Sequence, residues 1–254
     1  MSIVLNEYEW TENKLRERSL GKKPMETLAR VARYYADQQY SKREVRKRLD
    51  AFLLQCDPDA PLAKWSNTLD KVTKSANRYK PVKIDGISIT ESELAVIDEV
   101  KSLPAKRLAF TLLCVSKYWD VVSPRNDHWV NTPDNELLQM ANVSGSLKRQ
   151  SDLFRSLRDA GLIQFSKKVD NLNVRVLFSD DGKRKMFIRD FRNLGYQYEM
   201  YCGGHFYECA NCGLIVRAPK QTRGAKPKYC PSCAVEVRTK QNVNAVMRHR
   251  QISS

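Results

Sequence analysis

Two cysteine pairs close to the C-terminus are the residues whose types and spacing most directly indicate chemistry. Cys209 and Cys212 form one C-x-x-C unit, Cys230 and Cys233 form another, and seventeen residues separate the two units. Each unit places two thiolates on one tight turn, and four sulfur ligands suit tetrahedral Zn²⁺. Gly213, directly after the first unit, allows the left-handed backbone that such a turn often needs. The spacing therefore predicts one metal site with zinc as its ion.

The four cysteines predict a structural zinc rather than a catalytic one. Catalytic zinc sites keep one coordination position open for water and commonly use three protein ligands, often His or carboxylate. Four thiolates close the coordination shell, and the chain contains neither an H-x-E nor an H-E-x-x-H motif. A pair of redox dithiols is the alternative, but the surrounding sequence does not show a thioredoxin-like βαβ pattern.

The other three cysteines are expected to play ordinary roles. Cys202 and His205 form a C-x-x-H just before the first pair. They could add a ligand or hold a second metal, but we favour a packed pair without one. Cys56 and Cys114 lie in apolar helical runs and are interpreted as buried thiols. An odd count of seven cysteines with paired C-x-x-C units favours metal thiolates in a reducing compartment over disulfides.

Basic residues surround the cysteines. The chain has 44 Lys and Arg against 29 Asp and Glu, a formal charge of +15, and residues 209–254 hold nine basic residues against one acid. This charge attracts polyanions, among which we favour nucleic acid over an acidic protein or a negative membrane surface. The loop between the pairs has no acid, and we expect it to bind phosphates. Its basic residues are Arg217, Lys220, Arg223, Lys226 and Lys228.

Several classes of protein are disfavoured by what the sequence lacks. No apolar run approaches the roughly eighteen residues of a membrane span. The first residues show no basic segment followed by an apolar one, so we expect no secretory signal and a cytoplasmic protein. P-loop and G-x-S-x-G motifs are absent. Asp127, Asp134 and Asp152 lie near one another in sequence, but solvated or capping roles are expected for them, and we predict no enzyme.

The N-terminal third predicts a small helical bundle. Apolar residues recur at helical spacing over residues 22–39, 41–56 and 62–78. Ser41 with Glu44 forms a capping box at the start of the second helix. The polar side of that helix is basic through Lys42, Arg43, Arg46, Lys47 and Arg48, either as a binding face or as a solvated one.

A domain boundary is expected near residue 80. Asp85-Gly86, between alternating apolar residues, predicts a turn between two short extended pieces. Thr90 with Glu93 then forms a second capping box. The N-terminal helical domain is accordingly assigned to residues 1–80 and is the expected surface for a protein partner.

The central segment shows the element order of a winged helix-turn-helix. Helical patterns over 105–121, 133–143 and 147–162 precede alternating strands at 163–168 and 172–180. The passage "LFRSLRDAGLIQFSKK" resembles the end of the recognition helix and the first wing strand of that superfamily. "YECANCG" and "KYCPSCA" resemble the two knuckles of zinc ribbons. The resemblances imply a winged helix over 81–182, a connecting segment over 183–206 and a zinc ribbon with a basic tail over 207–254.

In helix-turn-helix proteins the start of the second helix contacts base edges, and nearby cations hold phosphates. Mapped onto this chain, the expected contacts on the helix and the following strand are Ser146, Lys148, Arg149, Gln150, Arg155, Arg158, Lys167 and Lys168. A protein-interaction role for the winged helix, with these cations merely solvated, is the alternative.

The prediction is a mainly α protein with small β elements that binds duplex DNA without being an enzyme. The arrangement resembles uncharacterised proteins of bacteriophages and mobile elements of Gram-positive bacteria, which implies replication or transcription control in a bacterial host cell. An inhibitor or adaptor that binds an RNA-guided effector or RNA polymerase, an RNA-binding protein, and a nuclease with a scattered site remain the alternatives.

Overall fold

The computed structural model describes residues 3–167, 173–219 and 227–252, with side chains up to residue 243. The chain divides into two compact units, residues 1–86 and 87–254. It is mainly helical with small antiparallel sheets, as the sequence predicts.

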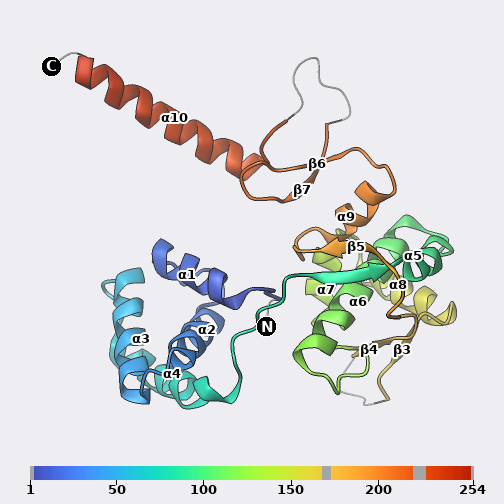
Figure 1. The fold of residues 1–254 in the computed structure, drawn as a ribbon, viewed down its shortest axis with the longest axis horizontal. Helices are drawn as coiled ribbons and strands as arrows, with labels where there is room; N and C mark the ends of the chain where they lie inside the picture. Colours follow the sequence, from blue (N-terminus) through green and yellow to red (C-terminus); the bar gives the residue numbers. More distant parts are fainter. Residues whose placement is uncertain (1–2, 168–172, 220–226, 253–254) are drawn as a thin grey trace. The chain divides into compact units, whose positions relative to one another are not determined.

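The first unit is a helical bundle (Figure 1). Its elements are α1 (Glu7–Glu17), α2 (Pro24–Asp37), α3 (Lys42–Cys56), α4 (Leu62–Ser75) and the short 3₁₀ helix η1 (Ala76–Arg78). Residues such as Leu28, Leu49 and Leu69, at helical spacing on α2, α3 and α4, are fully buried and form its core. The predicted capping box of Ser41 and Glu44 is present at the start of α3.

A buried carboxylate attaches α1 and the end of the unit to α2. Glu7 accepts hydrogen bonds from Arg30 at 2.9 Å and Arg33 at 2.8 Å, and its second oxygen accepts the backbone N–H of Val82 at 3.2 Å. A charge this deeply buried is tolerated because cationic donors surround it. Trp10 on α1 also packs against the Arg30 guanidinium, 4.9 Å from the ring centroid.

The second unit is arranged around one long apolar helix. Its helices are α5 (Glu91–Asp98), α6 (Leu103–Val122), α7 (Asp134–Met140), α8 (Leu147–Asp159), α9 (Leu194–Tyr201) and α10 (Pro231–Ile252). Residues 108–116 of α6 are all buried, because α5, α7, α8 and α9 each pack against this helix. A helix that is apolar all round is the expected centre of a core.

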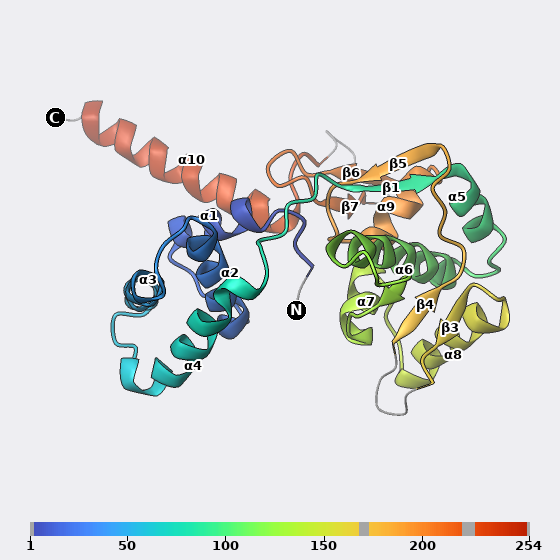
Figure 2. The ribbon, with the colours of Figure 1, turned by 60° about the horizontal axis from the view of Figure 1, so that its bottom comes forward.

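Three small antiparallel sheets complete the unit (Figure 2). The strands are β1 (Ile87–Thr90), β2 (Trp129–Val130), β3 (Ile163–Phe165), β4 (Val174–Val176), β5 (Arg184–Ile188), β6 (Phe206–Glu208) and β7 (Ile215–Arg217). β4 lies between β2 and β3, β1 pairs with β5, and β6 pairs with β7. The sheets of β1–β5 and β2–β4–β3 pack against α6, whereas the β6–β7 hairpin packs against α9.

The pairing of β1 corrects the expected turn at Asp85-Gly86. Ile87 pairs with Ile188, about a hundred residues further on, whereas Lys83 forms only an isolated bridge with Asn6 in the first unit. The two extended pieces therefore do not form a hairpin. The break between the two compact units falls after Gly86, six residues beyond residue 80.

Residues 183–206, expected as a connecting segment, include β5 and α9, which pack within the second unit. β5 completes the sheet with β1, and Tyr198 on α9 is buried with its ring 5.4 Å from that of Phe110. Gly195 lies so close to α7 that an added Cβ would stand 2.0 Å from the carbonyl oxygen of Ala141. This close approach requires glycine and makes α9 an integral helix of the unit.

A buried ionic network connects β1, α5, α6 and the segment before β5. Glu93, fully buried at the capping box with Thr90, accepts hydrogen bonds from Lys117 at 2.7 Å and from the backbone of Asp180 at 2.8 Å. Lys117 also donates to the carbonyls of Ser88 and Asp180 at 3.1 and 2.8 Å. These contacts hold β1 and the segment before β5 on α6.

Candidate metal centre and nucleic-acid surface

A hairpin and a helix start bring the four predicted cysteines together. Cys209 follows β6 and Cys212 lies on the turn before β7, where Gly213 has a φ of +70° and donates its N–H to the Cys209 carbonyl at 2.8 Å. Cys230 precedes α10 and Cys233 lies in its first turn. The four Sγ atoms all lie within 4.8 Å of one another.

The spacing of the sulfur atoms fits a metal-thiolate site. With metal–sulfur bonds of about 2.3 Å, neighbouring sulfurs of a tetrahedral site lie about 3.8 Å apart. The Sγ atoms of Cys212 and Cys230 are 3.8 Å apart. Within the described ranges, these four cysteines are the only group of three or more His, Cys, Asp and Glu side chains that could hold a metal. Cys202 and His205 lie outside it.

Local contacts shift the pKa values of two of these thiols in opposite directions. Burial opposes ionisation of Cys209, but N–H groups of Cys230, Asn211 and Cys212 donate to its sulfur and lower its pKa to about 6. The Asn211 amide also donates to Cys233 at 3.3 Å, yet contacts with the neighbouring thiols and burial raise the pKa of Cys233 to about 12. Sulfurs this close cannot all ionise unless a cation compensates their charge.

The second cysteine pair differs from the expected ribbon knuckle. Cys230 and Cys233 lie at the N-terminal end of α10, whereas the first pair lies on the β6–β7 hairpin. A helix N-terminus favours thiolates because its free N–H groups carry partial positive charge. The centre is therefore a hairpin-and-helix site in which the two pairs have different backbone surroundings.

The segment that carries the four cysteines contacts α9 and the residues before it. Arg192 donates to the Cys212 carbonyl at 2.6 Å, and Asn193 donates to the Ile215 carbonyl at 2.9 Å. Arg217, predicted to bind phosphate, forms an ion pair with Glu199 at 3.6 Å and packs against the Tyr196 ring, 5.4 Å from its centroid. Its side chain is still 55% exposed. Arg217 thus also serves packing, which the sequence does not indicate.

The remaining basic residues of the cysteine loop are only partly described. Lys228 is exposed, its ammonium lies 5.8 Å from the Tyr229 ring centroid, and its carbonyl accepts the Ala210 N–H at 3.0 Å. Lys220, Arg223 and Lys226 lie outside the described residues. The expected basic tail after Cys233 forms α10, on which Arg238 and Lys240 are exposed.

The predicted recognition helix presents basic side chains on its solvent face. Ser146 caps α8 by accepting the Arg149 N–H at 3.4 Å, and the inward face consists of residues such as Phe154 and Leu157. Lys148 and Arg149 are exposed and have no ion pair in the part of the chain that is described. The start of α8 therefore presents two cations that are available to bind an anion.

The other predicted contacts of this region have local partners or lie at its edge. Arg155 pairs with Asp152 at 3.8 Å and Arg158 with Asp159 at 2.7 Å, both exposed pairs within α8. Gln150 donates to the Gly145 carbonyl at 3.1 Å. Lys167 is exposed just after β3, and Lys168 lies outside the described residues.

The basic face of α3 is similarly divided. Arg46 forms ion pairs with Asp50 and Asp70, and the Arg48 guanidinium lies 3.9 Å from the Tyr40 ring centroid. Lys42, Arg43 and Lys47 are exposed. Only part of that predicted cluster is therefore free for a ligand.

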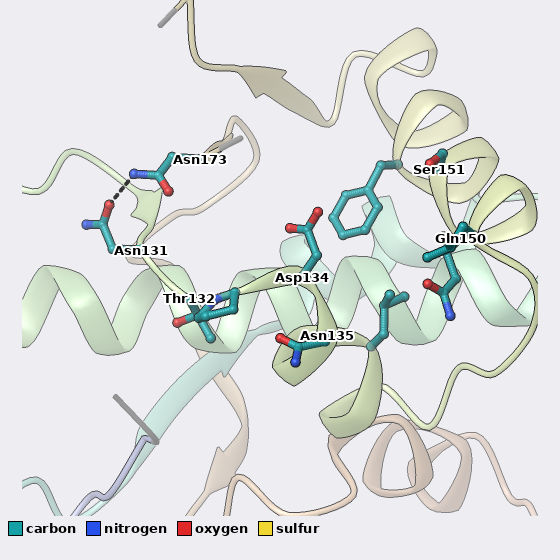
Figure 3. A pocket seen from close by; sticks show the side chains of 11 residues that line it. Asn131, Thr132, Asp134, Asn135, Gln150, Ser151 and Asn173 are labelled. Carbon is teal, nitrogen blue, oxygen red and sulfur yellow. Dashed lines mark hydrogen bonds between the residues drawn. The ribbon is translucent and has the colours of Figure 1, made fainter. Parts of the chain in front are cut away.

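A pocket of about 570 Å³ lies beside α8 and was not predicted (Figure 3). We call it the amide pocket. Its polar lining consists of Asn131, Thr132, Asp134, Asn135, Gln150, Ser151 and Asn173, and its apolar lining of Pro133, Leu138, Leu147 and Phe154. Burial raises the pKa of the Asp134 carboxyl. The lining comes from three separate segments, so no local sequence signal could have revealed it.

The acidic residues and histidines do not assemble into a second centre within the described ranges. Asp127 pairs with Arg175 at 2.6 Å, and Asp134 lies in the amide pocket. His128 contacts Asp120 at 2.6 Å, a pair with no local sequence signal because its members lie eight positions apart, one on α6 and one in the loop that follows.

No known family, curated protein or solved structure matches this chain. Among the described helices none has the length and apolar character needed to cross a membrane.

Proposed function

We propose that the chain is a non-enzymatic protein that binds duplex DNA through a winged helix-turn-helix over residues 103–176. The order α6, β2, α7, α8, β3, β4, with β4 central in its sheet, supports this assignment. In this arrangement α8 is the recognition helix and the segment between β3 and β4 is the wing.

The observation that carries the proposal is the free basic start of α8. Lys148 and Arg149 follow the Ser146 cap, are exposed and have no ion pair among the described residues. The N-terminal residues of a recognition helix contact base edges in the major groove. Arg149 is the better candidate for reading a base because guanidinium donors match guanine bidentately.

We further propose that the cysteine centre holds one structural Zn²⁺. Four thiolates leave no position for a catalytic water. The ion would stabilise a segment whose buried residues are mostly the cysteines themselves. Its role in binding would be to hold the basic loop and the start of α10 in place.

The charge distribution supports assigning phosphate contacts and base contacts to different segments of the chain. Residues 87–208 hold seventeen basic against sixteen acidic residues, a net charge of +1, whereas residues 209–254 carry +8. Phosphate contacts supply sequence-independent affinity, and base contacts supply specificity. We therefore assign most of the phosphate affinity to the cysteine segment and α10, and the base contacts to α8.

A salt titration tests the proposal. Affinities for duplex DNA, single-stranded DNA and RNA are measured between about 50 and 200 mM salt, a range over which several phosphate contacts cost a large factor in affinity. We expect duplex DNA to bind most tightly, with a steep log–log slope. No affinity for any of the three at low salt would refute nucleic-acid binding, and preference for RNA would refute the duplex assignment.

A substitution at the start of α8 tests whether this helix contacts bases. Arg149→Ala is expected to weaken binding to a selected DNA site by about 1–3 kcal/mol and to leave random duplex nearly unaffected. An equal loss on all duplexes would make Arg149 a phosphate contact instead.

A further inference from the structure

The amide pocket differs chemically from the basic surface of the chain. Its described lining contains no Lys or Arg, although the protein carries a formal charge of +15. Recognition of phosphate relies on cationic or backbone N–H donors. Carboxamides and hydroxyls over an apolar floor suit instead an uncharged ligand that offers several hydrogen-bonding groups.

Several polar atoms of the pocket have no partner among the described residues. Gln150 uses its Nε2 for the Gly145 carbonyl, which leaves Oε1 as a free acceptor. Asn173 donates its Nδ2 to Asn131 at 2.6 Å, which leaves its own Oδ1. Asn135 accepts the Glu136 N–H at 2.9 Å through Oδ1, which leaves its Nδ2 as a donor. The pocket thus offers both acceptors and a donor to a ligand.

The apolar part of the pocket is suited to a flat ring. Phe154 and Leu138 are largely buried and form its floor, and Leu147 on α8 is 82% exposed at its edge. The volume of about 570 Å³ lies within the range of about 300–1,000 Å³ that is usual for small-molecule sites. Aromatic and aliphatic side chains of this kind pack against the faces of nucleobases.

We propose that the amide pocket binds a single nucleobase, with adenine preferred. A base combines a flat apolar face with a row of donors and acceptors on its edge. Asn and Gln side chains match the amino and ring nitrogens of adenine. The carboxyl of Asp134 is a further acceptor for an exocyclic amine.

Two sources of the base share this chemistry. Gln150 and Ser151 belong to α8, so a base that leaves a bound nucleic acid could enter the pocket beside that helix. This source rests on the proposed DNA binding, whereas binding of a free nucleoside does not.

The test has two arms. In the first, calorimetry measures binding of adenosine, guanosine, cytidine and uridine to the full chain. In the second, fluorescence anisotropy compares a fully paired duplex with the same duplex carrying one unpaired adenine. We expect adenosine to bind most tightly, and the bulged duplex to bind about tenfold more tightly than the paired one, in line with about 1–3 kcal/mol for one stacked base.

The test variant is Asn135→Ala, because Asn135 is not among the proposed DNA contacts. It should weaken adenosine binding and the preference for the bulge about tenfold while leaving affinity for paired duplex unchanged. The matched control is Gln139→Ala, which removes an exposed carboxamide of the same helix outside the pocket. It should change neither adenosine binding nor the preference for the bulged duplex.

Each outcome decides between the sources or against the proposal. Adenosine binding without affinity for any DNA would support the pocket and refute the proposed function. A bulge preference without adenosine binding would identify a base presented by nucleic acid. Absence of both, or their survival in Asn135→Ala with an unchanged melting temperature, would overturn the proposal.

Discussion

Two neighbouring regions of the second unit keep their shape by different means. Residues 87–208 surround α6, which is buried along most of its length, and Glu93 and Lys117 pair inside that core. In residues 209–252 the buried cluster consists of Cys209, Cys230 and Cys233, with few apolar neighbours. Folding by burial requires apolar sequence, whereas folding around a metal requires only the ligands. A segment that folds around a metal therefore needs few apolar residues and can carry many basic ones.

Removal of a metal held by the four cysteines should have the largest effect and should separate the two regions. Cys230→Ser, or chelation of the wild type, is expected to release the ion and unfold residues 209–252, because metal binding supplies about 10–16 kcal/mol in small zinc modules. The core around α6 should keep its cooperative unfolding transition. Metal content by mass spectrometry and helicity by circular dichroism measure the two effects.

The matched control is Cys202→Ser, which removes an exposed thiol seven residues before the first ligand. It should retain one ion per chain. If Cys230→Ser also kept one ion per chain, the four-cysteine assignment would be wrong.

Breaking the buried ion pair should affect only the packed region. Glu93→Ala leaves the Lys117 ammonium buried without its carboxylate, which is expected to cost about 3–5 kcal/mol in the free energy of unfolding. The control Glu91→Ala removes an exposed partner of Lys185 and should cost less than about 1 kcal/mol. Denaturant titration measures the free energy of unfolding of both variants. An equal loss in the two variants would contradict a special contribution of the buried Glu93–Lys117 pair to stability.

Removing cations should distinguish the contributions of the two regions to the proposed DNA binding. The double variant Arg238→Gln, Lys240→Gln on α10 is expected to lower the log–log salt slope by about 2 for every duplex, because each phosphate contact contributes about 1. Lys47→Gln on α3, an exposed cation of the first unit, serves as the control and should leave the slope unchanged. A loss restricted to one DNA sequence would show that α10 reads bases.

A small effect of pH is expected for the packed region. The Ser92 hydroxyl and the Gly182 N–H donate to Asp180 and lower the pKa of its carboxyl below the usual 3.8. Ionised Asp180 therefore stabilises the fold above the unfolded pKa, and this contribution is lost as the pH falls through the lower folded value. Asp180→Asn should reduce the melting temperature slightly at pH 7 and have less effect below pH 4. A larger destabilisation at low pH would reverse the sign of this argument.

Local signals in the sequence were sufficient for much of the fold and for the four-cysteine cluster that could hold a metal ion. Ser41 and Thr90 cap their helices as predicted because a capping box lies within four residues. The cysteine cluster was predicted because each C-x-x-C is a local unit. The pairing of β1 with β5 was missed because it joins residues about a hundred positions apart, and the two-residue strand β2 is too short for a periodic pattern.

The amide pocket could not have been predicted for the same reason. Asn131, Gln150 and Asn173 reach it from the end of β2, from α8 and from the start of β4. Arg217 matches a phosphate-binding residue in sequence, but its contact with Glu199 depends on how α9 packs. Tertiary packing decides which polar side chains contact one another, and a local sequence pattern does not show these contacts.

The β1–β5 pairing has a consequence for any attempt to excise the region that we propose to bind DNA. A fragment ending at residue 182 would retain β1 and lose β5. Ile87 and Ile89, which are buried in the intact chain, would then lie on a bare strand edge with unpaired backbone groups. Such edges pair with other chains and cause aggregation. A fragment designed to stay soluble should therefore run from β1 to the end of α9. It then contains both β1 and β5, and each strand pairs with the backbone groups of the other.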